Sequence, residues 1–495
     1  MNKPTIPNIN LVERQQRIEA SLQPAYTEFL RLVKARGLTT GVEIGVGFGG
    51  HCESLLEYRG LEAVTGIDPY TSDDHDDVPN MLSQHDMDRV HDIALDRLAR
   101  FGRRFELLRK PSLQAVSKFE DESLDFIYID GDQQFDAVGS DLGAWFDKVR
   151  EGGIIAGHDY DNPDMPDVQQ AVDGFFQRLG WTVHHAGQFV WWVEKKRASV
   201  SYIVPAYNAE DTLWQATASI MEDNFVQGDE LIIIDDGSTD STGVIIDELV
   251  EAYPDISTIY HPENYGAAVA RNRAIADAKH ELIMMLDADN VLPTDSVAAL
   301  RDHLIKTNVD AACFSQIRLF RDGDEPGETA WTHEYPKAQA SLAQYCAMQD
   351  PPGAAGNMLF TREAWYRAGG YPEDVAALDS WGFGLRIVAT GSKLSVCPEG
   401  YYDHRIGHNS YWQREHQAGK TDRLALSLLR PYFSRLSTAS QFYLLQSKNQ
   451  DQWFTNLAEH PLLLDGDKRG RSVLGIALNI QSIRQRLARL VTRAA

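Results

Sequence analysis

The 495-residue sequence has room for two or three domains, and its 43% apolar share supports ordinary packed cores. Its formal net charge of −25 argues against a protein that wraps nucleic acid, because the phosphate backbone would repel it. No run approaches the roughly 18 apolar residues of a membrane span, and the N-terminus has no apolar signal region. The 4 cysteines form no C-x-x-C pair, so the sequence predicts a cytoplasmic protein with reduced, buried thiols.

The first part of the chain predicts a helix followed by an α/β domain. Residues 11–36 place apolar side chains on one face at helical spacing, so residues 1–37 should form a packing helix. Between residues 38 and 196, strand-like apolar runs alternate with helical stretches, which predicts a parallel sheet with helices on both faces. The expected strands are 42–44, 63–67, 105–108, 124–129 and 154–156, followed by a closing pair at 181–183 and 189–193.

A glycine-rich segment follows the first expected strand. Its spacing satisfies the dinucleotide fingerprint G-x-G-x-x-G, and Asp68 ends the second strand at the distance typical of a ribose contact. The preceding Glu43 completes E-x-G-x-G-x-G, which resembles the first motif of class I S-adenosylmethionine-dependent methyltransferases. An oxidoreductase function is an alternative that only the glycine spacing supports. The resemblance implies that S-adenosylmethionine is bound by Glu43, Gly45, Gly47, Gly49 and Asp68.

Two later segments resemble other methyltransferase strand ends. DFIYIDGDQQFDAV and EGGIIAGHDYDN match enzymes in which I-D-G-D-H precedes a helix and H-D-Y follows it. By resemblance to metal-dependent sugar O-methyltransferases, Asp130 and Asp159 would bind Mg²⁺, with His158 as a base. Gln133 stands where that pattern often has histidine, and a neutral amide cannot act as a base. Cofactor binding is therefore better supported than methyl transfer, and a non-catalytic module that binds a cofactor or a glycan stays open.

A second α/β series begins after residue 196 without a Gly/Ser-rich linker, so the two domains should pack against each other. Its strands are expected at 200–204, 231–234 and 282–286. Asp287 and Asp289 end the last of these strands, where open α/β sheets bind ligands. Such carboxylates suit Mg²⁺ or Mn²⁺, which could neutralise a nucleotide diphosphate, although a D-x-D alone is also compatible with a solvated turn.

Four motifs in this half closely resemble family 2 glycosyltransferases of the GT-A fold. They are VPAYN, IIDDGSTD, N-x-G-x-x-x-A-R-N and LDADN. The resemblance implies that Asp235 or Asp236 accepts the base N–H of a uridine-type nucleotide, and a UDP-sugar is the favoured donor. Arg271 would donate to phosphate, unless it pairs with an internal carboxylate. The implied nucleotide-sugar site comprises Pro205, Tyr207, Asp235, Asp236, Asn264, Gly266 and Arg271, with the metal on Asp287 and Asp289.

Gly356, Asn357 and Met358 resemble the acceptor-side wall of these enzymes. The catalytic base is the least regular part of the resemblance. Many relatives read E-D-x-x-x-x-L-R, with the second acid as the base, whereas this chain has Asp379 and then Ser380. A serine hydroxyl is far too weak a base, so Asp379 is expected to act, with Asp374 as the alternative. A further strand is expected at 394–397, and the segment YYDHRIGHNSY after it resembles the late GT-A segment whose histidine can complete the metal site. His408 is the first choice and His404 the second.

Residues 411–495 are expected to be helical, and arginines alternate with apolar residues from 472 onward. This last helix could lie on the inner face of an anionic membrane. Packing on a domain or on a dimer partner is the favoured alternative.

The predicted fold class is α/β, with two doubly wound sheets in tandem at 38–196 and 197–410. The predicted protein joins metal-dependent, inverting sugar transfer onto a glycan or glycosylated-protein acceptor to sugar O-methylation. The alternative is a glycosyltransferase with a binding module.

Overall fold

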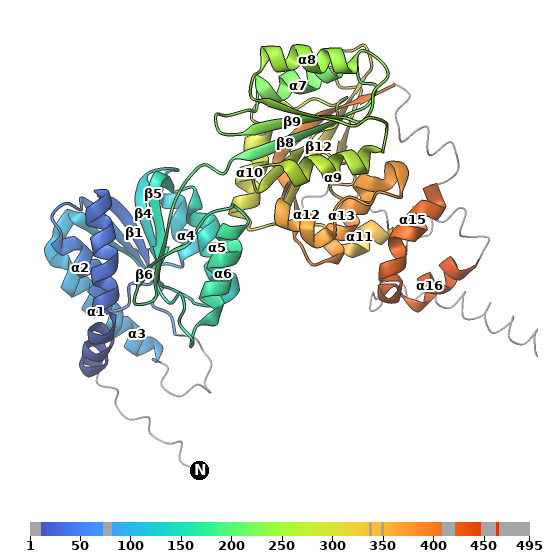
Figure 1. Ribbon diagram of the computed structural model, residues 1–495. Helices are drawn as coiled ribbons and strands as arrows, with labels where there is room; N and C mark the ends of the chain where they lie inside the picture. The colour runs from blue at the N-terminus through green and yellow to red at the C-terminus, as the bar shows by residue number, and fades with distance from the viewer. Residues whose placement is uncertain are drawn as a thin grey trace, which may run out of the picture. The chain divides into compact units, whose positions relative to one another are not determined.

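The computed structural model describes residues 11–72, 82–335, 339–347, 351–407, 421–446 and 462–464. The chain divides into two compact units, Met1–Ala198 with Ile305–Asn308, and Ser199–Leu304 with Val309–Ala495. Each unit carries its own β-sheet with helices packed on it (Figure 1). The predicted fold class, two α/β sheets in tandem, is confirmed.

A seven-stranded sheet forms the first unit. Its strands are β1 (Thr40–Ile44), β2 (Ala63–Ile67), β3 (Phe105–Leu108), β4 (Leu124–Ile129), β5 (Val149–Gly157), β6 (His184–Gly187) and β7 (Val190–Glu194). Their order is β3-β2-β1-β4-β5-β7-β6, and β1 to β5 are parallel, whereas β7 is antiparallel to both neighbours. The chain moves outward from β1 to β3 and then returns to β4 on the other side. Ligands of open sheets bind at such a reversal, beside the carboxyl ends of the strands.

Helices cover both faces of this sheet. They are α1 (Leu11–Arg36), α2 (Gly50–Glu57), α3 (Gln84–Leu98), α4 (Ser112–Ala115), α5 (Phe135–Phe146) and α6 (Pro166–Gln177), with 3₁₀ turns η1 (Ala99–Arg104) and η2 (Val116–Lys118). The predicted first helix thus spans its expected residues. It packs buried Phe29 against Phe126 and Tyr128 of β4, whose ring centroids lie 5.5 and 4.6 Å away. On the other side of the sheet, α5 and α6 lie next to each other (Figure 1).

The closing strand pair differs from its prediction at the first strand, which spans 184–187 rather than 181–183. Trp181 instead lies just after α6, where its backbone N–H donates to the Phe176 carbonyl and its ring stacks on Phe146 at 5.5 Å. Gln188 and Phe189 have positive φ values of 53° and 62° and form the turn between the two strands. Aromatic packing of Trp181 thus moves the start of β6 to His184, and hydropathy alone does not predict this.

The second unit has an eight-stranded mixed sheet. Its strands are β8 (Val200–Ala206), β9 (Glu230–Asp235), β10 (Ile256–Tyr260), β11 (Leu282–Met285), β12 (Ala311–Arg321), β13 (Trp331–Glu334), β14 (Met358–Thr361) and β15 (Leu394–Ile406). The order is β10-β9-β8-β11-β14-β12-β13, with β15 paired to β12. The first four of these are parallel, and β14 is antiparallel to β11. The order reverses between β8 and β11, so the end of β11 is a second expected ligand position.

Among its described residues, this unit has the helices α7 (Leu213–Met221), α8 (Thr242–Ala252), α9 (Ala267–Asp277), α10 (Ser296–Lys306), α11 (Leu342–Ala347), α12 (Arg362–Ala368), η3 (Ala376–Leu378), α13 (Asp379–Ala389), α15 (Thr421–Leu429), η4 (Arg430–Arg435) and α16 (Thr438–Leu445). A large apolar core joins α9 and α13 to the sheet. Within its described residues, the predicted C-terminal extension contains helices. The predicted helix from residue 472 lies outside the described residues, as does His408.

Strand β15 is longer than the expected strand at 394–397, because it continues to pair with β12 past a register shift between Phe314 and Gln316. His404 therefore belongs to a strand rather than to the loop after it. In the described part of the chain, no helix is long and apolar enough to cross a membrane. All four cysteines are free and buried, which confirms the prediction of buried thiols.

Candidate functional sites

The glycine loop after β1 is pressed against the end of β4. Gly45 has φ +89°, and a Cβ atom there would overlap the backbone carbonyl of Asp130, so a larger residue does not fit. The Gly45 N–H donates to the Ile67 carbonyl of β2, and the Asp130 N–H donates to the Ile44 carbonyl of β1, both at 2.8 Å. The ends of β1, β2 and β4 therefore meet at one point of the sheet edge.

Asp68 is tied to this loop by its carboxylate. It accepts hydrogen bonds from the backbone N–H groups of Val46, Gly47 and Tyr70 at 3.1, 3.0 and 2.8 Å. Burial raises the pKa of Asp68, and the three hydrogen bonds oppose that rise. A carboxylate has about four acceptor positions, so three bonds leave room for one more donor. The structure thus gives Asp68 a role in shaping the loop, and its contact with a ribose stays a prediction.

Glu43 is buried on β1, beneath the glycine loop. Its Oε2 atom accepts from the Cys52 thiol at 3.1 Å and lies 3.1 Å from His51 Nδ1. The His51 ring is itself enclosed between Tyr26 and Tyr128, with centroids 4.9 and 4.2 Å away. Glu43 therefore holds the first turn of α2 from below, and sequence reasoning did not find its two partners because neither belongs to a motif.

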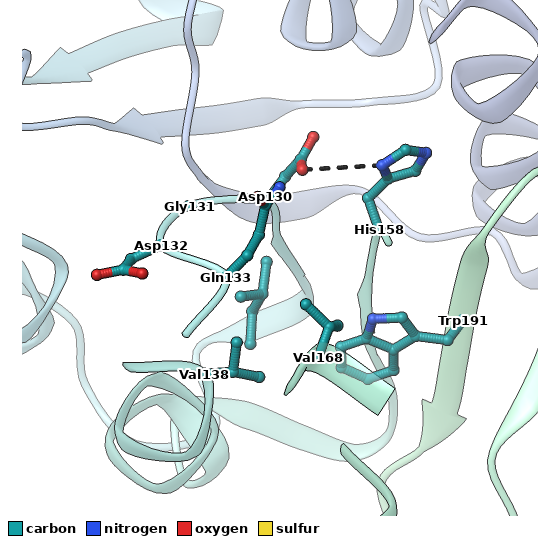
Figure 2. A pocket seen from close by; sticks show the side chains of 9 residues that line it. Asp130, Gly131, Asp132, Gln133, Val138, His158, Val168 and Trp191 are labelled. Atoms are coloured by element: carbon teal, nitrogen blue, oxygen red, sulfur yellow. Dashed lines mark ion pairs between the residues drawn. The ribbon is translucent and has the colours of Figure 1, made fainter. Parts of the chain in front are cut away.

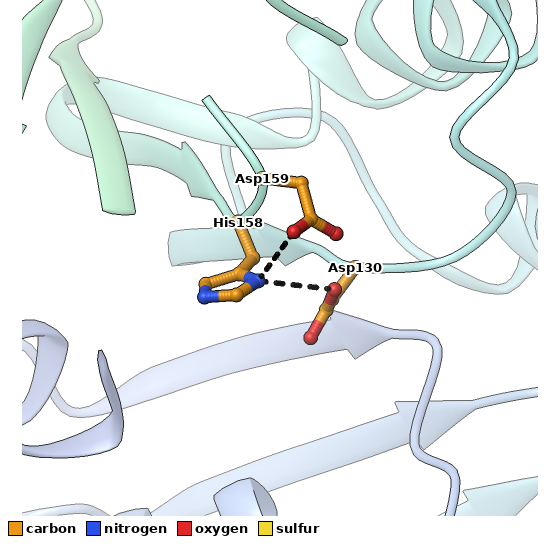
Figure 3. A group of neighbouring side chains, drawn as sticks. All are labelled: Asp130, His158 and Asp159. Atoms are coloured by element: carbon orange, nitrogen blue, oxygen red, sulfur yellow. Dashed lines mark ion pairs between the residues drawn. The ribbon is translucent and has the colours of Figure 1, made fainter. Parts of the chain in front are cut away.

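Asp130, His158 and Asp159 form a compact group at the neighbouring strand ends. Ile129 of β4 pairs with Gly157 of β5, so the residues that follow each strand are brought together. One ligand atom from each of the three side chains lies within 4.8 Å of the others. Figure 3 shows His158 Nδ1 facing both carboxylates, 3.2 Å from Asp159 Oδ1 and 3.9 Å from Asp130 Oδ1. The structure thus brings together all three residues predicted for this site.

The charges of this group are strongly coupled. Burial, reinforced by Asp159 and Glu43, raises the pKa of Asp130 to about 8, although His158 opposes the rise. Burial lowers the pKa of His158, but its hydrogen bond to Asp159 and the charge of Asp130 outweigh burial and raise it overall. Burial raises the pKa of Asp159, but hydrogen bonds from His158 and Asn162 outweigh it and lower the value. Two acids and an imidazole crowded in this way suit a divalent cation.

A pocket opens beside this group (Figure 2). Ile129, Val138, Val168 and Trp191 supply its apolar lining, and Asp130, Asp132, Gln133 and His158 supply its polar lining together with Gly131. Gln133 has a defined task here, because its amide donates to Asp159 Oδ2, while the Asn162 amide donates to Asp159 Oδ1 at 2.7 Å. Asn162 was missed at the sequence level, although it lies three residues after Asp159.

In the second unit, Arg271 connects two candidate site residues. It is buried on α9, with Nη2 2.6 Å from Asp287 Oδ1 and Nη1 bonded to Asp379 Oδ2. Burial lowers the pKa of Arg271, but the two carboxylates outweigh this and raise it. Burial raises the pKa of Asp287, although Arg271 opposes that rise. Of the two roles left open by the sequence, the structure shows Arg271 in the pairing with internal carboxylates.

Segments far apart in sequence converge around Asp287. Its backbone N–H donates to Asn357 Oδ1 at 2.9 Å. A Cβ atom at Gly356, where φ is +97°, would lie 2.8 Å from Ser380 Oγ and 3.6 Å from Asp287 Oδ2. Asp379 lies beside Ser380, and its Oδ1 accepts the Ser380 N–H at 2.7 Å. The expected acceptor-side wall, the D-x-D and the expected base segment therefore lie together, while Asp374 is exposed.

Strand β15 runs along the other side of the D-x-D. Val291 and Asp403 exchange two backbone hydrogen bonds of 3.0 Å, and Arg405 Nε donates to the Asp289 carbonyl at 3.3 Å. His404 is half-buried on this strand, and its Nδ1 lies 3.5 Å from the Tyr402 hydroxyl. In the residues that the structure describes, Asp287 and Asp289 are not part of a group of three metal-ligating side chains.

The two acids at the end of β9 differ in what they hold. Asp236 accepts the N–H groups of Tyr265 and Gly266 at 3.0 and 2.8 Å and lies 2.7 Å from His261 Nδ1. Asp235 accepts the Ser238 N–H at 2.9 Å. The remaining predicted residues lie along the same edge: Pro205 in β8, the exposed Tyr207 after it, and the exposed Asn264 and half-buried Gly266 before α9.

Comparison with known proteins separates the same two regions. Residues 201–367 match the model described as "Glycosyl transferase family 2", and residues 42–160 match one described as "Methyltransferase domain". An uncharacterized glycosyltransferase of Haemophilus influenzae is 35% identical over 114 residues, which are 22% of this chain and 45% of the relative. Glycosyltransferase GlyG of Streptococcus pneumoniae is 30% identical over 111 residues, 22% of this chain and 36% of the relative. The chain thus spans less than half the length of either relative.

Among solved structures, the chain is similar to a mannosyltransferase of Pyrobaculum calidifontis in complex with GDP-Man and Mn²⁺. They are 21% identical, and the match covers 58% of this chain and 80% of that chain with a TM-score of 0.37. The strand orders and the two family models, rather than this low score, support the assignment. The chain joins a methyltransferase-like domain to a domain of glycosyl transferase family 2.

Proposed function

We propose that the second unit transfers a sugar from a nucleotide-sugar, with a UDP-sugar favoured, to a glycan or glycosylated-protein acceptor with inversion. The observation that carries this proposal is the convergence of Asp287, Gly356 and the Asp379–Ser380 segment at the switch point of the sheet. The match to glycosyl transferase family 2 supports it. A site of this composition can combine an acceptor wall, a base and a cation that neutralises the leaving diphosphate.

The chain's own residues take distinct parts in this proposal. Asp287 and Asp289 would hold Mg²⁺ or Mn²⁺, with His408 as a third ligand and His404 as its alternative. Asp235 is the better candidate for the nucleotide base, since Asp236 is already engaged by the loop before α9.

Asp379 would accept the proton of the acceptor hydroxyl. Its carboxylate is buried and pairs with Arg271, which holds it beside the D-x-D. Ser380 Oγ lies between Asp379 and the acceptor wall at Gly356 and can orient the acceptor there.

For the first unit we propose S-adenosylmethionine-dependent O-methylation of a sugar, assisted by a divalent cation on Asp130 and Asp159. The methyltransferase family model and the acid group beside a half-apolar pocket support it. The second candidate is a module that binds the cofactor or a glycan without transferring methyl groups. It is favoured by Gln133, an amide that cannot take a proton.

The sugar-transfer proposal is tested by replacing the D-x-D. Asp287→Ala and Asp289→Ala should abolish metal-dependent nucleotide release from a panel of UDP-sugars with glycan acceptors, because the cation site is lost. Asp277→Ala is a matched control, since it removes an acid whose side chain is 43% exposed on α9 of the same unit. Near-normal transfer by either D-x-D variant would show that the D-x-D is only a turn.

The methyl-transfer proposal is tested by two separate measurements on the intact chain. Calorimetry should detect binding of S-adenosylhomocysteine, and binding of NAD(H) instead would restore the oxidoreductase interpretation. Methyl transfer to a sugar acceptor should then stop in excess chelator. Cofactor binding without transfer to any acceptor of a broad glycan panel would favour the binding module.

A further inference from the structure

Histidine 158 faces the two acids of the first unit in an unusual way for a base. Its Nε2 atom lies 3.1 Å from the backbone carbonyl of Gln188, and its Nδ1 atom lies 3.2 Å from Asp159. Both ring nitrogens therefore have protein partners, and neither is left for an acceptor hydroxyl. The base role that the sequence suggested for His158 does not explain these two contacts.

The contact with Gln188 fixes which nitrogen carries hydrogen. A carbonyl oxygen only accepts, so Nε2 carries a hydrogen and Nδ1 is the nitrogen that can ligate. In the neutral ring the Nδ1 lone pair then points at the two carboxylates, and either a proton or a metal ion between them removes the repulsion. Hydrogen bonding of one imidazole nitrogen to a backbone carbonyl, with the other nitrogen free to ligate, is the usual arrangement of a metal-bound histidine.

The surroundings hold Asp159 in a ligating position as well. The Gln133 amide bonds to one of its oxygens and the Asn162 amide to the other. The backbone of Asp159 is left-handed, with φ 62°, a strained conformation that a functional constraint can explain. Ligands of one small divalent ion lie roughly 3 to 4 Å apart, given bonds of about 2.1 Å. His158 Nδ1 lies 3.2 Å from Asp159 Oδ1 and 3.9 Å from Asp130 Oδ1, so both distances already fall in this range.

We propose that His158 is the third ligand of the first unit's cation site, bound through Nδ1, and that the site prefers a first-row transition ion such as Mn²⁺, Fe²⁺ or Co²⁺ over Mg²⁺. This inference rests on the metal site of the proposed function. The preference follows from chemistry, because an imidazole nitrogen binds transition ions well, whereas Mg²⁺ favours oxygen ligands. Gln133 then acts as a positioning residue, because its amide holds Asp159 in place. A histidine at position 133 would bring a second imidazole that competes for the ion.

The test uses Mn²⁺ as the probe and the full chain carrying Asp287→Asn and Asp289→Asn, so that the second unit contributes no ion. Pulsed electron paramagnetic resonance should show nitrogen-14 coupling to bound Mn²⁺. His158→Ala should abolish this coupling and weaken Mn²⁺ binding by about 10-fold or more, the scale on which even outer partners of a ligand act. His185→Ala is the matched control, since His185 is a nearby histidine with a half-exposed side chain, and it should retain the coupling.

Each outcome decides a separate point. Bound Mn²⁺ without nitrogen coupling would overturn the ligand role of His158, and displacement by equimolar Mg²⁺ would overturn the preference. Absence of Mn²⁺ binding would overturn the whole cation site. Nitrogen coupling without binding of S-adenosylhomocysteine would leave this inference standing and refute the methyltransferase. If His158→Ala does not fold, as judged by circular dichroism, nitrogen-15 histidine labelling of the His185→Ala chain provides the same readout.

Discussion

Replacing Arg271 by methionine is the sharpest test of the second site, because one buried cation there serves two acids. Arg271 Nη2 lies 2.6 Å from Asp287, and Nη1 bonds to Asp379, with side-chain exposures of 7% for Arg271 and 5% for Asp379. Breaking a buried pair costs about 3–5 kcal/mol, since an unpaired charge is left behind. We therefore expect Arg271→Met to destabilise the second unit by about that amount at neutral pH.

The matched control lies two residues away on the same helix. Arg273 pairs with Asp277 at 2.9 Å, but both side chains are about half exposed, so Arg273→Met should cost only about 0.3–0.5 kcal/mol. Adding Asp379→Asn to Arg271→Met should restore part of the loss, because it removes one of the two stranded charges. The deficit should also shrink as the pH falls, since burial raises the pKa of Asp287 and its protonated carboxyl no longer needs the guanidinium.

The measurement must report on the second unit alone, because a chain of two units need not unfold in one step. Hydrogen exchange of peptides from α9 and β11 under native conditions gives the free energy of opening of that unit. Equal losses for Arg271→Met and Arg273→Met would refute the reasoning. So would a failure of Asp379→Asn to recover any stability in the Arg271→Met background.

Three further outcomes are expected. Asp68→Ala should weaken S-adenosylhomocysteine binding by about 1–3 kcal/mol in calorimetry, because three loop N–H groups lose their acceptor; unchanged affinity would remove Asp68 from the cofactor site. Asp379→Asn should lower sugar transfer by about 10²–10⁴-fold while donor binding persists, and a normal rate combined with an inactive Asp374→Asn would move the base to Asp374. Mn²⁺ affinity of the first unit should rise from pH 6 to pH 9, because the cation must displace a proton from Asp130, whose pKa is raised to about 8; a flat profile in a titration would contradict this protonation state.

The sequence was sufficient for the two sheets because their strands are short apolar runs that end in polar motifs. Leu282 to Leu286, for example, are all fully buried, as an uninterrupted apolar run predicts. The candidate site at the strand ends could also be predicted, because neighbouring parallel strands bring Asp130 and Asp159 to the same edge of the sheet. Where the sheet is mixed, pairing with β12 extended β15 beyond its apolar part, and local hydropathy carried no sign of it.

Side-chain pairing was much less predictable than strand position. The two partners of Arg271 lie 16 and 108 residues further along the chain, and both were named for other tasks. The sequence also gave no reason to place His51 beside Glu43, since that contact depends on how α2 docks under the glycine loop. Polar partners of this kind follow from tertiary packing, and no local periodicity encodes them.

The close approach of the Gly45 backbone to the carbonyl of Asp130 has a thermodynamic consequence. The loop expected to hold the cofactor and the strand end expected to hold a cation touch through backbone atoms that cannot separate without breaking the hydrogen bonds of β1. If a ligand orders the glycine loop, the entropic cost of ordering the end of β4 should therefore fall, and the reverse should hold as well. By linkage, a cation that tightens S-adenosylhomocysteine binding must itself bind more tightly, by the same factor, when the cofactor is present.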